Sequence, residues 1–127
     1  MHRNFGITAA VLGFAAVALG AFGAHALRDH LDAASQQLWH TAVEYQFWHA
    51  LALLMLAGFA PRTRIWRIAA VAFTLGCVLF CGSLYALALG APRFIGVITP
   101  FGGLALLAGW LAAGIGFWRS ASEKNLH

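Results

Sequence analysis

Four ionisable side chains lie in or beside the apolar runs of this sequence: His25, His40, Glu44 and His49. A titratable group is costly in hydrocarbon, so such groups usually face the interior of a helix bundle, a partner or water. Histidine is a frequent metal ligand and changes charge near neutral pH. One hypothesis is therefore that His25 meets Glu44 or His49 to form a proton relay, a metal site or a ligand pocket.

Helical spacing divides these residues into two groups. His40 and Glu44 are four residues apart and share one face, whereas Tyr45, Gln46 and His49 share another. Along a helix, Glu44 and His49 are separated by about 8 Å and about 140°. The simpler interpretation of His40 and Glu44 is a surface pair at the water interface. That of Gln46 and His49 is hydrogen bonding inside a bundle, as polar residues in spans commonly do.

A sulfur-containing metal site is a further hypothesis. Cys77 and Cys81 share one helix face, and two thiols near a histidine could hold Cu(I) or zinc. The weak candidate ligands are therefore His25, His49, Cys77 and Cys81. There is no C-x-x-C motif, and free cysteine is often buried as a small hydrophobe, so core packing without a cofactor is favoured. His25 lies near a membrane boundary and His49 well inside a span, which is a poor match for two ligands of one haem.

The composition defines the surroundings of these residues. Hydrophobic residues make up 61% of the chain and charged residues 9%, and the mean hydropathy is +0.77. Such a chain is too apolar for a small soluble domain, and about 20 apolar residues suffice to cross a bilayer. We predict an all-α, polytopic membrane protein consisting of one four-helix transmembrane domain, residues 1–127, with spans at about 5–24, 41–59, 68–89 and 95–118.

Basic residues predict the orientation. The first apolar run is about 20 residues long, longer than that of a secretory signal, so we interpret it as an uncleaved span. With four spans, six of the eight basic residues lie on the side of the termini and two on the other: Arg3, Arg62, Arg64, Arg67, Arg119 and Lys124 against Arg28 and Arg93. The positive-inside rule then places both termini in the cytoplasm of a bacterium. No basic stripe with interleaved aromatics lies outside the spans, which argues against nucleic-acid binding.

The ends of the helices can also be predicted. Asp32 is a good N-cap residue, so the second helix should extend from about Ala33 to Phe59, after a short interfacial segment that follows the first span. Thr99 as N-cap and Pro100 at the first helical position would begin the fourth helix. The apolar segment 94–98 would then lie outside the regular helix. The periplasmic end of the bundle would contain most of its polar residues: His25, Glu44, Gln46, Ser83, Tyr85 and Thr99.

Small residues recur at helical spacing in the outer spans. They are Ala16, Gly20 and Ala24 in the first span and Ala105, Gly109 and Ala113 in the fourth. Small residues at this spacing allow two helix backbones to approach closely. We expect them to serve packing within the chain rather than dimerisation. 

Four segments, in order, resemble a known family. They are Gly20-Ala-Phe-Gly-Ala-His-Ala-Leu27, Tyr45-Gln-Phe-Trp-His-Ala-Leu51, Gly82-Ser-Leu-Tyr85 and Ile98-Thr-Pro-Phe-Gly-Gly103. They are similar to the small four-span membrane family of unknown function that includes bacterial YgdD proteins and eukaryotic transmembrane protein 256. The family typically has serine at the position of Cys81 and glycine at that of Ala26. The resemblance implies a fold and a location but no activity, and its motifs contain His25, Tyr45, Gln46, His49, Ser83, Tyr85, Thr99 and Pro100.

Three classes of function follow. No nucleophile with its base, phosphate-binding loop or zinc-hydrolase motif is recognisable, so an enzyme is not favoured. The leading hypothesis is a non-enzymatic accessory of larger inner-membrane complexes, with the lipid bilayer, other membrane proteins or a second copy of the chain as partners. The alternatives are binding or transport of a small ligand, ion or lipid in the periplasmic half of the bundle, and a metal or redox protein that uses His25 and His49.

The basic-residue asymmetry makes the topology testable. A fluorescent protein that matures only in the cytoplasm should be bright when fused after residue 127, and a phosphatase that is active only in the periplasm should be inactive there. Fusions within the segment 27–40 should give the opposite result. An active phosphatase at the C-terminus would contradict the predicted orientation.

Overall fold

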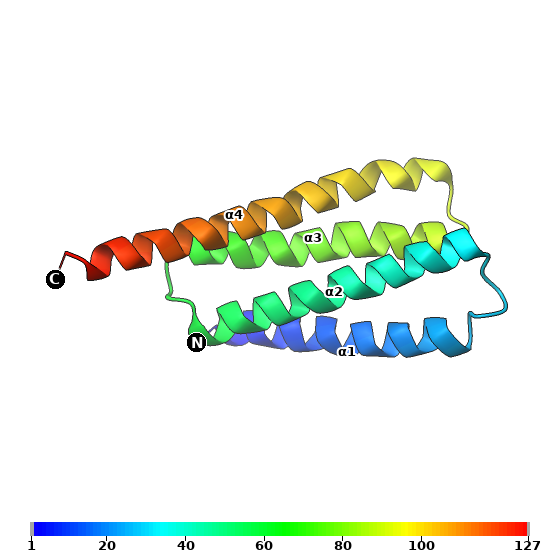
Figure 1. The fold of residues 1–127 in the computed structure, drawn as a ribbon, viewed down its shortest axis with the longest axis horizontal. Coiled ribbons are helices and arrows are strands. Elements are labelled where there is room, and N and C mark those ends of the chain that lie inside the picture. The colour runs from blue at the N-terminus through cyan, green and yellow to red at the C-terminus, as the bar shows by residue number, and fades with distance from the viewer. Residues whose placement is uncertain (1, 127) are drawn as a thin grey trace.

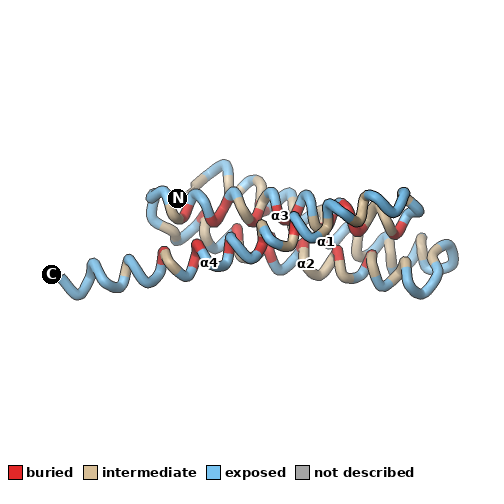
Figure 2. The backbone as a smooth tube through the Cα atoms, turned by 90° about the horizontal axis from the view of Figure 1, so that it is seen from above, coloured by how far each residue is buried: buried red, intermediate tan, exposed pale blue. Residues whose placement is uncertain are grey.

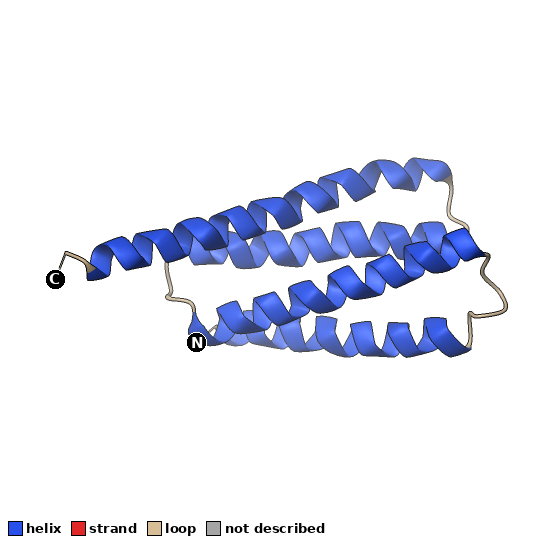
Figure 3. Cartoon of the chain, in the orientation of Figure 1, coloured by secondary structure: helices blue, strands red, loops and turns tan. Residues whose placement is uncertain are grey.

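The structure, a computed structural model, describes residues 2–126 as four long antiparallel α-helices (Figure 1). Figure 3 shows no strand in this part of the chain. The helices are α1 (Arg3–His25), α2 (Ala33–Phe59), α3 (Arg64–Ala88) and α4 (Ile98–Lys124), and a short 3₁₀ helix, η1 (Arg93–Val97), precedes α4. Neighbours in sequence pack together: α1 on α2, α2 on α3, and α3 on α4. The prediction of an all-helical chain is confirmed.

Three stretches are long and apolar enough to cross a membrane. They are α1, α3 and the combined stretch of η1 and α4, Arg93–Lys124. α2 is long enough but is not among them, and it is the helix that carries Glu44, Gln46 and His49. Three of the four predicted spans therefore meet the criterion of length and composition.

The start of α2 is as predicted. The Asp32 carboxylate accepts a hydrogen bond from the backbone N–H of Ser35 at 2.7 Å, and α2 runs from Ala33 to Phe59. This hydrogen bond holds the pKa of the Asp32 carboxyl below its usual range. A lowered pKa means that the cap stabilises the fold above the ordinary pKa of an aspartate and is lost as the pH falls through the lowered value.

The start of α4 differs from the prediction. Helix α4 begins at Ile98, and Val97 occupies the N-cap position. The chain already winds as η1 over residues 93–97, so it enters α4 without the extended residue that a threonine cap requires. Pro100 lies in the first turn, where its missing N–H costs no hydrogen bond. Thr99 is therefore not a cap, and its hydroxyl contacts α3 instead.

Glycines of α4 face aromatic residues of α3 at a constant spacing. In each helix the three residues are seven positions apart, and the antiparallel pairing matches them one to one. A Cβ built on any of the three glycines would come closer than 3.0 Å to its aromatic neighbour. The pairs are Gly102 with Phe80, Gly109 with Phe73, and Gly116 with Trp66. The missing side chains thus let α4 approach α3, and Gly109 of the predicted small-residue motif acts within the chain.

The hairpin of α1 and α2 repeats this arrangement with small partners. Gly6, Gly13 and Gly20 are also seven positions apart, and their nearest neighbours are Ala57, Ala50 and Val43. A Cβ on Gly20 would lie 3.2 Å from Val43, and the other two sites are less crowded. We call this seven-residue spacing of glycines, found in both hairpins, the glycine register.

Large apolar side chains cover the outside of the molecule. Figure 2 shows buried positions where the helices meet and exposed positions along their outer sides. Phe14, Val17, Leu107 and Phe117 are each more than half exposed, although the core keeps Leu53 and Phe73 almost fully buried. Such a surface is suited to lipid rather than to water.

Gly102 provides a direct test of the glycine register. Gly102→Ala should lower the free energy of unfolding by about 1–3 kcal/mol, because its Cβ would meet the backbone of Phe80, which cannot rotate away. Gly114→Ala on the same helix is the matched control, since nothing lies within 4 Å of a Cβ there. Denaturant titration in mild detergent measures both. Equal stability of the two variants would contradict the register.

Candidate functional site

Gln46 connects three helices inside the bundle. It is 5% exposed, and its amide nitrogen donates to the backbone carbonyl of Leu12 on α1 at 2.9 Å. The hydroxyl of Tyr85 on α3 donates to its amide oxygen at 2.8 Å. Both ends of the side chain are therefore used, and Gln46 and Tyr85 lie together as the sequence suggested.

His49 connects α2 to α4. Its Nε2 atom lies 3.0 Å from the indole nitrogen of Trp110, and its Nδ1 atom lies 2.7 Å from the backbone oxygen of Tyr45. An indole N–H can only donate, so Nε2 must accept, and the proton of a neutral ring is then on Nδ1, where it is donated to Tyr45. With both nitrogens engaged, His49 offers no free lone pair to a metal while Trp110 stays in place.

Ser83 and Thr99 make a third link, between α3 and α4. Ser83 is 6% exposed and donates its hydroxyl proton to the backbone oxygen of Phe80 at 2.9 Å. The Thr99 hydroxyl, 2.6 Å from that of Ser83, is then the donor between the two side chains. Among the residues described, no buried polar side-chain atom lacks a hydrogen-bond partner.

His25 and Glu44 do not join these links. His25 is the exposed last residue of α1, and Glu44 pairs with His40 on the surface at 2.8 Å. The register that sets Gly20 against Val43 places His25 about three turns, roughly 16 Å, from the level of His49. The hypothesis that His25 meets His49 is therefore wrong, whereas the interpretation of His40 and Glu44 as a surface pair is confirmed.

The two cysteines belong to the core. Cys77 packs with Phe73 and Leu106, and Cys81 packs with Ala42 and Leu84. Both are free and buried. Across residues 2–126, no three His, Cys, Asp or Glu side chains are grouped so that they could hold a metal ion.

Two grooves lie between α2 and α4, and Trp110 lines both. The outer groove, on the side of η1, has a volume of about 680 Å³ and is lined by Tyr45, Trp48, His49, Phe80, Pro100, Gly103, Leu104, Leu106, Leu107 and Trp110. The inner groove, on the side of the termini, has a volume of about 420 Å³, and Met55, Phe59, Phe117, Ser120 and Lys124 are among its lining residues. Both are mainly apolar. The Trp110–His49 hydrogen bond lies at the boundary between them.

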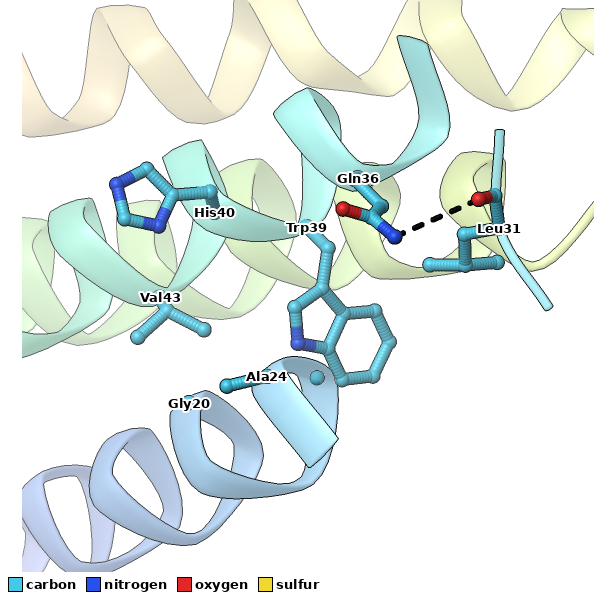
Figure 4. Close-up of a pocket in the computed structure, with 8 residues that line it drawn as sticks. Gly20, Ala24, Leu31, Gln36, Trp39, His40 and Val43 are labelled. Atoms are coloured by element: carbon cyan, nitrogen blue, oxygen red, sulfur yellow. Dashed lines mark hydrogen bonds between the residues drawn. The ribbon is translucent and has the colours of Figure 1, made fainter. Parts of the chain in front are cut away.

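A smaller pocket of about 140 Å³ lies between the outer ends of α1 and α2. Figure 4 shows the Trp39 indole directed at α1, next to Gly20 and Ala24, with the Gln36 amide toward Leu31. The indole donates to the backbone oxygen of Leu19 at 2.9 Å, and a Cβ on Gly23 would collide with it. Trp39 lines this pocket, and its hydrogen bond to Leu19 fixes the first turns of α2 on α1.

Sequence reasoning missed Trp39 and Trp110. Both indoles donate a hydrogen bond to a neighbouring helix, although tryptophan in a span is expected mainly at the membrane interface. The available signal was position, because Trp110 lies well inside its apolar stretch, where an indole N–H needs an internal acceptor. The acceptors themselves, a histidine on another helix and a backbone carbonyl, carry no sequence pattern that would identify them.

Comparison with known proteins places the chain in a family. Residues 19–103, which contain most of the links above, match the family described as "Protein of unknown function (DUF423)". The chain belongs to this family. It is 46% identical over 123 residues to the UPF0382 inner membrane protein YgdD of Escherichia coli K12, with 95% of this chain and 94% of that protein covered.

Other relatives come from Haemophilus influenzae and Bacillus subtilis. A UPF0382 membrane protein of Haemophilus influenzae is 40% identical, with 96% of this chain and 99% of that protein covered. YwdK of Bacillus subtilis, also a UPF0382 membrane protein, is 39% identical, with 86% and 91% covered. No solved structure matches the chain. The resemblance to YgdD proteins is thus confirmed, and these DUF423-family names give a membrane location and no activity.

The link between His49 and Trp110 can be measured by a double-mutant cycle. His49→Leu and Trp110→Phe should each destabilise the protein, but together they should cost less than the sum, with a coupling of about 0.6 kcal/mol, which is typical of hydrogen bonds in membranes. Trp118→Phe, which changes an exposed tryptophan of the same helix, should be additive with His49→Leu. Additivity of the first pair as well would show that the hydrogen bond contributes nothing.

Proposed function

We propose that this chain is a non-catalytic protein of the bacterial inner membrane that holds the apolar chain of a membrane amphiphile in its outer groove. The observation that carries the proposal is the groove itself. Its volume of about 680 Å³ lies within the roughly 300–1,000 Å³ of ordinary ligand sites. Its lining is mostly apolar and aromatic, and only Tyr45 and His49 contribute polar side chains.

The walls of the groove suit a flexible chain better than a rigid polar ligand. Trp48, Leu104 and Leu107 line it and are exposed on the outer surface, so it is open to the side where lipid would lie. His49 has both ring nitrogens engaged, and Tyr45 packs its ring against Phe80 with centroids 4.8 Å apart. The imidazole of His49 and the ring of Tyr45 therefore hold the walls in place, and van der Waals contact supplies most of the binding.

The proposal requires α2 to cross the membrane with the other three helices. Its support is that α2 is 27 residues long, is antiparallel to α1 and α3, and packs between them. Its polar side chains are satisfied internally: Gln46 by Leu12 and Tyr85, and His49 by Trp110. Satisfied polar groups lower the cost of insertion that hydropathy alone assigns to them. Both termini then share one side, which the basic residues predict to be the cytoplasm.

The accessory role in a larger complex stays a prediction. Small-residue motifs would be its natural contact surfaces in lipid. However, Gly20 and Gly109 are used within the chain, against Val43 and Phe73. The ligand-binding proposal is favoured because it starts from a groove that those contacts leave open.

Filling the outer groove tests the proposal. In Gly103→Leu the new Cβ would make only ordinary contact with Phe80, at 3.7 Å, so the fold should persist while the added side chain occupies the groove. Photo-crosslinking with a phospholipid that carries a diazirine on its acyl chain should label the half-buried groove residue Tyr45 several-fold less than in the wild type. Labelling of Phe14, on the outside of α1, should not change.

Gly114→Leu is the matched control, because it adds the same side chain to α4 where nothing lies within 4 Å. It should leave labelling of the groove at the wild-type level. If Gly103→Leu left the labelling of Tyr45 as high as this control does, the outer groove would not be a binding site and the proposal would fail.

A further inference from the structure

The inner groove has a polar mouth that the outer groove lacks. Met55, Phe59 and Phe117 form apolar walls, whereas Ser120 and Lys124 line the same cavity toward the C-terminal end of α4. An apolar groove that ends at an ammonium group could take both the acyl chain and the charged headgroup of a phospholipid. The proposed function assigned no role to this groove.

A second cavity adjoins this mouth and adds more positive charge. It has a volume of about 310 Å³, shares Pro61, Trp66 and Ser120 with the inner groove, and is also lined by Arg64, Arg119 and Glu123. Taken together, the two cavities are lined by three basic side chains and one acidic side chain. The two adjoining cavities together are therefore apolar at one end and net positive at the other.

The helix geometry explains why these groups gather there. Gly116 lets the Trp66 ring lie against α4, so that the two helices meet closely just before Arg119. Beyond this contact α4 continues past the ends of the other helices (Figure 1). Arg119 is therefore presented beside the start of α3, where Arg64 is located, and Lys124 lies about 8 Å further along α4. This end also contains the basic residues that predict a cytoplasmic location.

We propose that these two adjoining cavities bind an anionic phospholipid of the cytoplasmic leaflet. One acyl chain would occupy the inner groove, whose mouth carries Lys124, and the phosphate group would lie beside Arg64 and Arg119 in the adjoining cavity. Basic pockets between helices on the cytoplasmic side are suited to anionic headgroups, and guanidinium groups match phosphate oxygens in geometry. Basic residues that served topology alone would not need to line a cavity that adjoins an apolar groove. The site rests on the proposed function only for its orientation in the membrane.

Charge removal at the mouth tests this site. Native mass spectrometry of the full chain in mild detergent should show that phosphatidylglycerol binds about tenfold more tightly than phosphatidylcholine with the same acyl chains. The double variant Arg64→Gln/Arg119→Gln should lose this preference. Both side chains are exposed, so the fold should be unaffected. The double variant Arg28→Gln/Arg93→Gln removes the same charge at the opposite end and should keep the preference.

Three outcomes would overturn the proposal. They are equal binding of the two lipids by the wild type, the same loss in both double variants, or displacement of phosphatidylglycerol by millimolar inorganic phosphate, which would indicate a site for the free anion. Gly103→Leu should leave the preference intact, because it alters only the outer groove. Failure of one proposal is therefore distinguishable from failure of the other.

Discussion

Close approach of α3 and α4 depends on the absence of a side chain at three positions of α4. Helices in lipid gain little from hydrophobic burial against each other, so van der Waals contact and hydrogen bonds must hold them together. Gly102, Gly109 and Gly116 supply that contact by accepting Phe80, Phe73 and Trp66. A shift of one helix along the other by one turn, three or four residues, would bring each of these aromatic rings against alanine or a larger residue instead of glycine.

The same register determines which polar groups can meet. Ser83 lies three positions after Phe80 and Thr99 three positions before Gly102, so the antiparallel pairing brings their hydroxyls to one level. Contact between α2 and α4 is of a different kind. The two helices are not packed backbone to backbone but are linked through the Trp110 indole and His49. The grooves on either side of that indole are the space that this long-range link leaves open.

Local signals were enough to predict the four helices, the extent of α2 and the inward position of Gln46 and His49. Asp32 succeeds as a predicted cap because capping involves only the next few residues. The prediction of Thr99 as a cap is wrong because the chain is already helical in η1 when it reaches α4. The formation of η1 depends on how residues 93–97 pack. The distance of His25 from His49 depends on the register between α1 and α2. The hydrogen bond of Trp110 depends on how α4 is placed relative to α2. The seven-residue spacing of glycines was visible in the sequence, but its meaning required knowledge of what each glycine faces.

The Trp110–His49 bond also bears on whether the protein holds a ligand or moves it. If the indole stays in place, the outer and inner grooves are separate sites, and a chain entering from one leaflet cannot reach the other groove. Moving the indole would leave the His49 Nε2 atom without its donor in an apolar setting, and another apolar chain could not replace that donor. An apolar ligand supplies no replacement hydrogen bond, so only added van der Waals contact could offset the cost of opening. The arrangement favours stable binding of one chain in each leaflet over passage between the leaflets.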